Sequence, residues 1–228
     1  MKKFNFVFDK SKKALYLKKI ILKRYSNTSI KKADAIIVGG GDGFMLKTIK
    51  KLYKLNKPFY GINCGSVGFL LNKYDTKKVL EKINKAKITI VNPLQVQTIN
   101  KLKRRSSFLA INELSLFRQS KQTSLLKLTI NNKTLIKKLI GDGILLSTPA
   151  GSTAYNLSVN GPILSLNSKK IAITPISPFR PRRWKGKIIS ESKSIYILNL
   201  DPKKRPVAAV ADNNEIRNIV RVKVSINK

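Results

Sequence analysis

Residues 33–43 read Ala-Asp-Ala-Ile-Ile-Val-Gly-Gly-Gly-Asp-Gly and decide the class of the fold. The apolar run that ends at Val38 predicts a buried strand, and the chain passes from it directly into a turn of glycines. Residues 44–55 then carry apolar side chains at the period of a helix. A strand, a glycine turn and a helix in this order make half of an α/β unit.

The sequence on either side of this stretch continues the alternation. Residues 4–8 and 58–63 predict strands, and residues 11–25 predict a helix. Another helix is expected at 76–84, with Asp75 as its N-cap. This order is typical of a parallel, doubly wound sheet. We therefore expect a Rossmann-like α/β domain over residues 1–97.

The texture of the sequence changes after residue 86. Short strand-like runs follow one another to the C-terminus, and Asn131-Asn132-Lys133 indicates a hairpin turn between two of them. A β-rich, β-sandwich-like second domain is expected over residues 98–228. The predicted strands are 88–91, 94–99, 108–117, 125–130, 134–140, 143–147, 171–176, 195–200 and 220–226.

The composition excludes several kinds of function. The 228 residues contain no histidine and only one cysteine, Cys64. Without histidine there is no Ser-His-Asp triad and no histidine-bound metal, and one cysteine forms neither an internal disulfide nor a Cys-rich zinc site. No apolar run approaches the ~18 residues of a membrane span, and the start of the chain lacks the apolar region of a signal peptide. We expect a soluble, cytoplasmic protein with no membrane partner.

The charge has three explanations. The chain has 47 Lys and Arg against 11 Asp and Glu, a formal net charge of +36. Such a charge fits a nucleic-acid surface, the steering of a small anionic substrate, or simply solubility in a protein encoded by an AT-rich genome. Because the basic residues are spread along the whole chain and no known nucleic-acid motif accompanies them, we expect no specific nucleic-acid partner.

The first candidate site is the glycine turn itself. Glycines between a strand and a helix allow positive φ angles and let phosphates approach backbone N–H groups. Asp42 needs a separate reason to be there, because an acid repels phosphate: it binds a metal, accepts a proton from a sugar hydroxyl, or caps the helix. The turn is neither a Walker A loop nor a Rossmann fingerprint, since Phe44 stands where the third glycine would be.

Three other stretches carry candidate site residues. Asn63-Cys64-Gly65-Ser66-Val67-Gly68 closes the strand at 58–63, so it either shares one crevice with the first glycine turn or is a packing turn. Cys64 fits a buried small residue better than a nucleophile. Asn112-Glu113 interrupts an apolar run, which places the pair at a strand end or against polar ligand groups. Residues 141–158, rich in glycine and hydroxyl side chains, offer many hydrogen-bonding groups to a nucleotide or form an ordinary loop.

In combination these stretches resemble the NAD kinases. The resemblance covers about residues 33–215 and rests on Gly40-Gly41-Asp42-Gly43, on Asn112-Glu113 and on Ser147-Thr148-Pro149-Ala150-Gly151-Ser152-Thr153-Ala154-Tyr155. The glycine motif alone is shared with phosphofructokinases and lipid kinases, whereas the long segment after an Asn-Glu pair is specific. The family transfers the γ-phosphoryl of ATP, in some members also of polyphosphate, to the 2′-hydroxyl of the adenosine ribose of NAD, giving NADP.

The resemblance also implies roles for individual residues. It makes Asp42 the general base and places Asp142, often from a neighbouring subunit, at the NAD pocket. It further implies an α/β domain followed by a β-sandwich, a homodimer or homotetramer, and Mg²⁺ bound with the ATP phosphates rather than at a metal site of the protein. The implied nucleotide-binding residues are Gly40, Gly41, Asp42, Gly43, Lys47, Asn63, Gly65, Asn112, Glu113, Asp142, Ala150, Thr153, Ala154, Tyr155, Asn156, Leu157, Ser158, Ser177 and Asp212.

The sequence departs from the family pattern at a few positions. Ile140 stands where some members carry an arginine just before the Gly-Asp pair, so that contact is absent or supplied elsewhere. Phe179 stands where a histidine often follows, and Phe44 where a small residue is usual. Two other functions remain open at this point. A lipid kinase would need an apolar acyl-binding cleft, and a nucleic-acid-binding module would use the charge and ignore the glycine turns.

Overall fold

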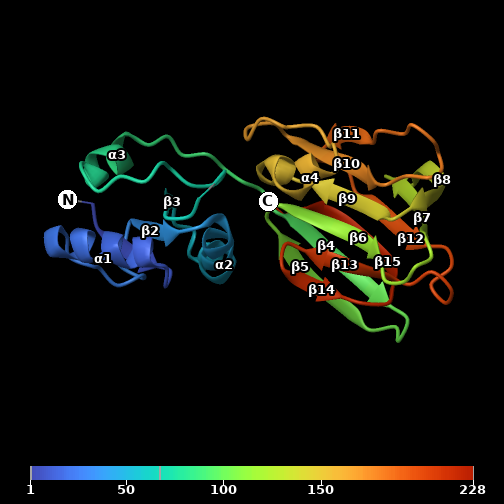
Figure 1. Ribbon diagram of the computed structural model, residues 1–228, viewed down its shortest axis with the longest axis horizontal. Helices are drawn as coiled ribbons and strands as arrows, with labels where there is room; N and C mark the ends of the chain where they lie inside the picture. The colour runs from blue at the N-terminus through green and yellow to red at the C-terminus, as the bar shows by residue number, and fades with distance from the viewer. Residues whose placement is uncertain (1, 67, 228) are drawn as a thin grey trace. The chain divides into compact units, whose positions relative to one another are not determined.

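The computed structural model describes residues 2–66 and 68–227 and divides into two compact units (Figure 1). Unit 1 comprises Met1–Ile88 and unit 2 comprises Thr89–Lys228. The boundary expected between residues 97 and 98 falls inside a strand, β4 (Leu94–Asn100), whose partner strands all belong to unit 2. Within the described residues, no helix is long and apolar enough to cross a bilayer.

Unit 1 is an α/β domain with a parallel sheet of three strands in the order β1-β2-β3. Its elements are β1 (Phe4–Phe8), α1 (Lys12–Arg24), β2 (Ala35–Gly40), α2 (Asp42–Leu52), the short 3₁₀ helix η1 (Tyr53–Leu55), β3 (Phe59–Asn63) and α3 (Val79–Lys85). The Rossmann-like prediction for this part of the chain is confirmed.

Helices cover both faces of this sheet. Neighbouring residues of β2 point to opposite sides, so each face has apolar side chains on which a helix packs. Ile37 packs in a cluster with the buried side chains of α1 and with Val79 of α3. Ile36 and Val38 pack on the other side with Met45 of α2. The alternation of side chains along a strand thus sets the doubly wound arrangement that the sequence predicted.

Two local predictions in this part of the chain are wrong. Asp75 does not cap a helix: its carboxylate accepts the N–H of Lys77 at 2.6 Å in a local turn, and α3 begins only at Val79 with no side-chain cap. Residues 88–91 alternate like a strand but form none, and Ile88 and Ile90 are 79% and 76% exposed. Among the described residues, 88–91 belong to no sheet, so the alternating pattern alone does not make a strand.

Unit 2 is a β-sandwich of two six-stranded sheets, with every named strand pair antiparallel. One sheet has the order β11-β10-β9-β6-β13-β14 and the other β5-β4-β15-β12-β7-β8 (Figure 1). Besides β4, its elements are β5 (Arg105–Ala110), β6 (Glu113–Arg118), β7 (Ser124–Ile130), β8 (Lys133–Gly141), β9 (Gly143–Ser147), η2 (Ala150–Thr153), α4 (Tyr155–Ser158), β10 (Lys170–Ile176), β11 (Lys187–Ser190), β12 (Ile195–Asn199), β13 (Val207–Ala211), β14 (Asn214–Ile216) and β15 (Ile219–Ile226).

Both sheets contribute buried side chains to one apolar core, which includes Leu94 and Val222 from one sheet and Leu114 and Ile144 from the other. Burial of each such side chain contributes roughly 1.5–3 kcal/mol. The predicted hairpin is confirmed, since Asn131 and Asn132 both have positive φ, as a tight turn between twisted strands requires. The β-sandwich prediction is confirmed with it.

Strand β9 lies in the middle of the first sheet, between β6 and β10. Its five residues, Gly143–Ser147, are all buried. The run predicted as one strand at 108–117 is broken into β5 and β6, which belong to different sheets. The pair Asn112-Glu113 lies at this break, beside the end of β9 that leads into residues 148–158.

Candidate active site

In unit 1, the Asp42 carboxylate joins the two predicted glycine turns. Its Oδ2 accepts the backbone N–H of Phe69 at 2.8 Å, and its Oδ1 accepts that of Leu70 at 3.2 Å. The N-cap of α2 is Gly41, with no side-chain cap, so the helix-capping explanation for Asp42 does not hold. Phe69 and Leu70 follow the second turn, so these contacts bring the two turns together at the carboxyl ends of β2 and β3.

The glycines of the first turn provide space rather than unusual backbone angles. Gly41 has φ −98°, and Gly186 is the one glycine with positive φ among the described residues, so the expected positive φ is absent here. A Cβ built on Gly41 or Gly43 would meet no heavy atom within 4 Å. A Cβ on Gly40 would lie 2.9 Å from the Asp9 carboxylate. The turn is therefore open at Gly41 and Gly43, where a ligand has room.

The second turn is held by its own asparagine. Asn63 Oδ1 accepts the Gly65 N–H at 2.8 Å, and a Cβ on Gly68 would lie 3.1 Å from the Asn63 amide and 3.3 Å from Asp42 Oδ1. Cys64 is buried, and burial raises the pKa of its thiol to about 11, with a smaller contribution from Asp9. A thiol with that pKa is a poor nucleophile at neutral pH. Val67 of this motif lies outside the described residues, and Lys47 is exposed on α2.

In unit 2, Asn112 and Glu113 have buried oxygen atoms without partners. No described group forms a hydrogen bond to Asn112 Oδ1 or to Glu113 Oε2. Burial raises the pKa of Glu113 to about 7, and the negative charge of Asp212 adds to the rise. A buried acceptor left unpaired costs about 1–3 kcal/mol, so a polar ligand that donates a hydrogen bond to either oxygen would be stabilised here.

The backbone of this pair is held by the segment that follows β9. The Thr148 N–H donates to the Asn112 carbonyl at 2.9 Å, and Thr148 Oγ1 donates to the Ile111 carbonyl at 2.7 Å. Gly151 lies so close that a Cβ there would be 2.1 Å from the Asn112 carbonyl oxygen. Two motifs that are distant in sequence therefore meet, as the resemblance implied.

Residues 153–158 divide into buried and exposed side chains. Asn156 is fully buried, and its amide donates to the carbonyls of Ser152 and Pro162 while its Oδ1 accepts the Thr174 hydroxyl. These bonds fix the segment on the sheet. Tyr155 and Leu157 are 38% and 43% exposed, and Ser158 is exposed as well. Ala150 is buried beneath the same segment in η2.

Asp142 and Ser177 lie at the other end of β9. Glu113 pairs with Ser147, whereas Phe117 pairs with Gly143, so Asp142 and Glu113 are separated by the length of the strand, about 17 Å at ~3.3 Å per residue. Ser177 follows Ile176, which pairs with Gly143. One copy of the chain therefore does not bring Asp142 and Ser177 to the Asn112-Glu113 pair.

Arg118, the partner of Asp142, is not predicted from the sequence. Arg118 Nε donates to Asp142 Oδ1, and the Arg118 N–H donates to the Asp142 carbonyl at 2.9 Å. Arg118 of β6 is thus the cationic partner of Asp142. The signal in the sequence is faint, because Arg118 is one of many cations and only the register of β6 against β9 brings it to Asp142.

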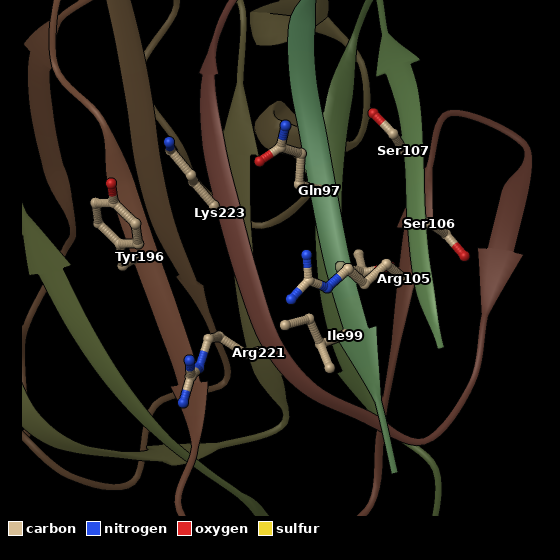
Figure 2. Close-up of a pocket in the computed structure, with 9 residues that line it drawn as sticks. Gln97, Ile99, Arg105, Ser106, Ser107, Tyr196, Arg221 and Lys223 are labelled. Carbon is tan, nitrogen blue, oxygen red and sulfur yellow. The ribbon is translucent and has the colours of Figure 1, made fainter. Parts of the chain in front are cut away.

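A further hollow lies on the outer face of the second sheet and contains none of the predicted residues. It has a volume of about 400 Å³, and its lining includes Arg105, Arg221, Lys223 and Tyr196 (Figure 2). The six strands of this sheet contain no Asp or Glu. With only 11 acids in the whole chain, such a stretch without acids is unremarkable, and the hollow is not assigned a ligand.

Two family models match most of the chain. The model of the ATP-NAD kinase N-terminal domain matches residues 4–88, and that of the ATP-NAD kinase C-terminal domain matches residues 111–227. The NAD kinase of Caulobacter vibrioides is 45% identical over 202 residues, which are 89% of this chain and 78% of that protein. The NAD kinase of Rickettsia felis is 43% identical over 226 residues, or 99% of this chain and 89% of that protein. The chain belongs to the ATP-NAD kinase family.

Solved structures show the same fold at lower identity. A yeast NADH kinase complexed with NADH aligns with a TM-score of 0.79 at 21% identity, covering 100% of this chain and 81% of that one. An NAD kinase from Archaeoglobus fulgidus in complex with ATP aligns with a TM-score of 0.78 at 21% identity, covering 99% and 90%. The architecture of both units is thus that of known kinases of this kind.

Proposed function

We propose that this protein is an NAD kinase, which transfers the γ-phosphoryl group of ATP to the 2′-hydroxyl of the adenosine ribose of NAD and produces NADP and ADP. The observation that carries the proposal is the position of the Asp42 carboxylate between two glycine turns, in a chain of the ATP-NAD kinase family. The direct test is the formation of NADP by the purified protein with ATP, Mg²⁺ and NAD.

We assign Asp42 as the general base. The 2′-oxygen bonds to the γ-phosphorus, the bond from that phosphorus to the β–γ bridging oxygen breaks, and the hydroxyl proton passes to the Asp42 carboxylate. The two backbone N–H groups use one lone pair on each carboxylate oxygen, which leaves acceptor capacity for the hydroxyl. Because phosphoryl transfer has a loose transition state, positioning and charge neutralisation contribute more than strong basicity.

In this proposal Mg²⁺ is bound by the phosphates of ATP. Among the described residues, no three carboxylate or cysteine side chains gather as a metal site would require. Mg²⁺ prefers phosphate oxygens and water, with few protein ligands, so it fits an ATP-bound ion. When bound, it supplies neutralisation of the phosphate charge. The open space at Gly41 and Gly43 leaves room for the phosphates near backbone N–H groups.

The NAD site is assigned to the Asn112-Glu113 pair and the segment 153–158. The unpaired buried oxygens of the pair fit the hydroxyl and amide donors of a dinucleotide. Gly40, Lys47, Asn63 and Gly65 of unit 1 are assigned to nucleotide binding separately, as the resemblance implies. Ala150 and Asn156 act through the backbone of the segment rather than through exposed side chains.

Asp142 and Ser177 enter the site from a second copy of the chain. About 17 Å of strand separates Asp142 from Glu113 within one copy, so a pocket that uses both needs two copies. A homodimer or a homotetramer meets this requirement. We place the enzyme in the cytoplasm, where its small-molecule substrates ATP and NAD are made and used.

A further inference from the structure

The turn between β13 and β14 holds the backbone of the Asn112-Glu113 pair through one side chain. Asp212 Oδ2 accepts the Ile111 N–H at 2.9 Å, and Asp212 Oδ1 accepts the N–H groups of Asn112 at 2.9 Å and Glu113 at 3.3 Å. The Asp212 N–H in turn donates to the Glu113 carbonyl at 3.1 Å. Three consecutive backbone donors therefore converge on one carboxylate.

Asp212 adopts a backbone conformation that most residues avoid. Its φ is +51°, in the left-handed region, where glycine is the residue with the least strain. Strain at a non-glycine residue persists where the surrounding structure over-determines it, and it is more frequent at functional sites. A glycine would relieve the strain at this turn but would leave the three N–H groups without the carboxylate.

The opposite side of the same backbone is held by uncharged groups. The carbonyls of Ile111 and Asn112 accept from Thr148, and Gly151 packs against Asn112. With its carbonyls held by Thr148 and its N–H groups held by Asp212, the segment has little freedom to turn. Asn112 Oδ1 and Glu113 Oε2 lie on this held backbone without hydrogen-bond partners among the described residues.

We propose that Asp212 is a positioning residue that fixes the backbone of Ile111, Asn112 and Glu113 and thereby sets the direction in which Asn112 and Glu113 present their oxygen atoms to NAD, an inference that rests on the proposed NAD kinase function. Asp212 is thus assigned an indirect role through the backbone rather than a contact with the dinucleotide. The assignment accounts for an acid at a turn where the backbone favours glycine.

The effect of the Asp212 charge on the ionisation of Glu113 distinguishes this role from a merely structural one. Burial and the Asp212 carboxylate together raise the pKa of Glu113 to about 7. Glu113 pairs with the uncharged Ser147 of β9, and the neighbouring Asn112 contacts the uncharged Thr148 and Gly151. Removal of the Asp212 charge should let Glu113 ionise at lower pH, so the pH profile of kcat/KM for NAD should move to lower pH.

The test compares Asp212→Ala and Asp212→Asn with Asp201→Asn, a matched control. Asp201 is also a turn aspartate of unit 2, accepting the Lys204 N–H at 3.1 Å, and it lies outside the proposed site. We expect Asp212→Ala to raise KM for NAD by at least about tenfold while KM for ATP changes by less than about twofold. Asp212→Asn keeps the shape and one of the two acceptor oxygens, so it should retain the fold and shift the pH profile. The control should match the wild type.

The outcomes distinguish the inference from the function on which it rests. Wild-type protein that makes no NADP would overturn the proposed function. Active wild type together with an Asp212→Asn variant of unchanged KM for NAD and unchanged pH profile would overturn the role of Asp212 alone. If Asp212→Ala does not fold, the Asp212→Asn profile decides. Equal rises in KM for NAD and for ATP would also count against a role directed at NAD.

Discussion

The Asp42 carboxylate accepts the backbone N–H of Phe69 at 2.8 Å, a bond between residues 27 positions apart in the chain. This bond, with its neighbour from Leu70, ties the start of α2 to the loop after β3. It places the one acid of the first glycine turn where the carboxyl ends of two parallel strands meet. Asp42 is therefore already oriented by the protein before any ligand binds.

Removal of the Asn112 amide should weaken NAD binding without loss of the fold. Asn112→Ala removes one hydrogen-bonding side chain, so we expect a loss of about 1–3 kcal/mol in NAD affinity. Tyr155→Ala should also weaken NAD binding, because Tyr155 is partly exposed in the segment 153–158 to which the NAD site is assigned. Calorimetric titration with NAD, beside thermal unfolding, checks both variants. An unchanged NAD affinity in folded Asn112→Ala would count against this site.

The partly buried Glu113 should make the protein less stable as the pH rises. Its pKa is about 7 in the folded state, above the ordinary value of 4.5, so the folded state binds the extra proton between these two values. Stability is then lost as the pH rises from 4.5 through 7, and below 4.5 the penalty vanishes. Glu113→Gln should be more stable than the wild type by about 1–3 kcal/mol at pH 8, and the two should converge near pH 4.5.

Urea unfolding at several pH values measures this difference. The Glu81→Gln variant, which removes an exposed carboxylate of α3, is the control and should show no such convergence. A Glu113→Gln variant that is equally or less stable at pH 8 would mean that the carboxyl is satisfied in the folded protein.

A mixture of two variants that each use NAD poorly should recover activity at low NAD if Asp142 acts across a subunit interface. Asp142→Ala and Asn112→Ala chains in a mixed dimer leave one site with both residues intact. Random mixing of equal amounts should therefore restore up to about a quarter of wild-type activity. Refolding or co-expression of the two chains, followed by the NADP assay, measures the recovery. No recovery from a dimer shown to be mixed would place Asp142 outside the site or in its own chain's site.

The net charge of +36 should act through a general field rather than through a nucleic-acid site. ATP and NAD should bind somewhat better at low salt, because salt screens charges over a Debye length of about 10 Å at 0.1 M. DNA and RNA should bind weakly and without sequence preference. A salt titration of nucleic-acid binding checks this. The same titration on a variant with Arg105, Arg221 and Lys223 replaced by serine tests whether the hollow in Figure 2 contributes to that binding. Sequence-selective nanomolar binding that survives about 0.2 M salt would contradict the account.

The sequence predicts those parts of the fold that are marked by the periodicity of apolar residues or by turn residues. The parallel sheet of unit 1 and the Asn131-Asn132 hairpin are examples, because period and turn residues are local. Strand β13 was missed, since its Val-Ala-Ala-Val-Ala sequence has weak strand preference and is placed by pairing with β6. Residues 88–91 are the converse case. Their sequence alternates like a strand, but they form no strand in the structure.

The candidate site divides in the same way. The motifs named the residues around Asp42 and around Asn112-Glu113, because each motif is a short run. Contacts set by register were not predictable: Arg118 with Asp142, Asp212 with the backbone of the pair, and the length of β9 between Asp142 and Glu113. These depend on which residues of distant strands face each other, and no local pattern records that.

One assay tests the central claim most directly: NADP formation by the wild type and by Asp42→Asn, with ATP, Mg²⁺ and NAD, read by an NADP-specific dehydrogenase. Asp34→Asn is the matched control, because Asp34 also binds a backbone N–H in unit 1 but lies before β2. We predict NADP from the wild type and the control, and a turnover at least about a hundredfold lower for Asp42→Asn with little change in NAD affinity. Near-normal turnover of Asp42→Asn would contradict the assigned base, and no NADP from the wild type would contradict the function.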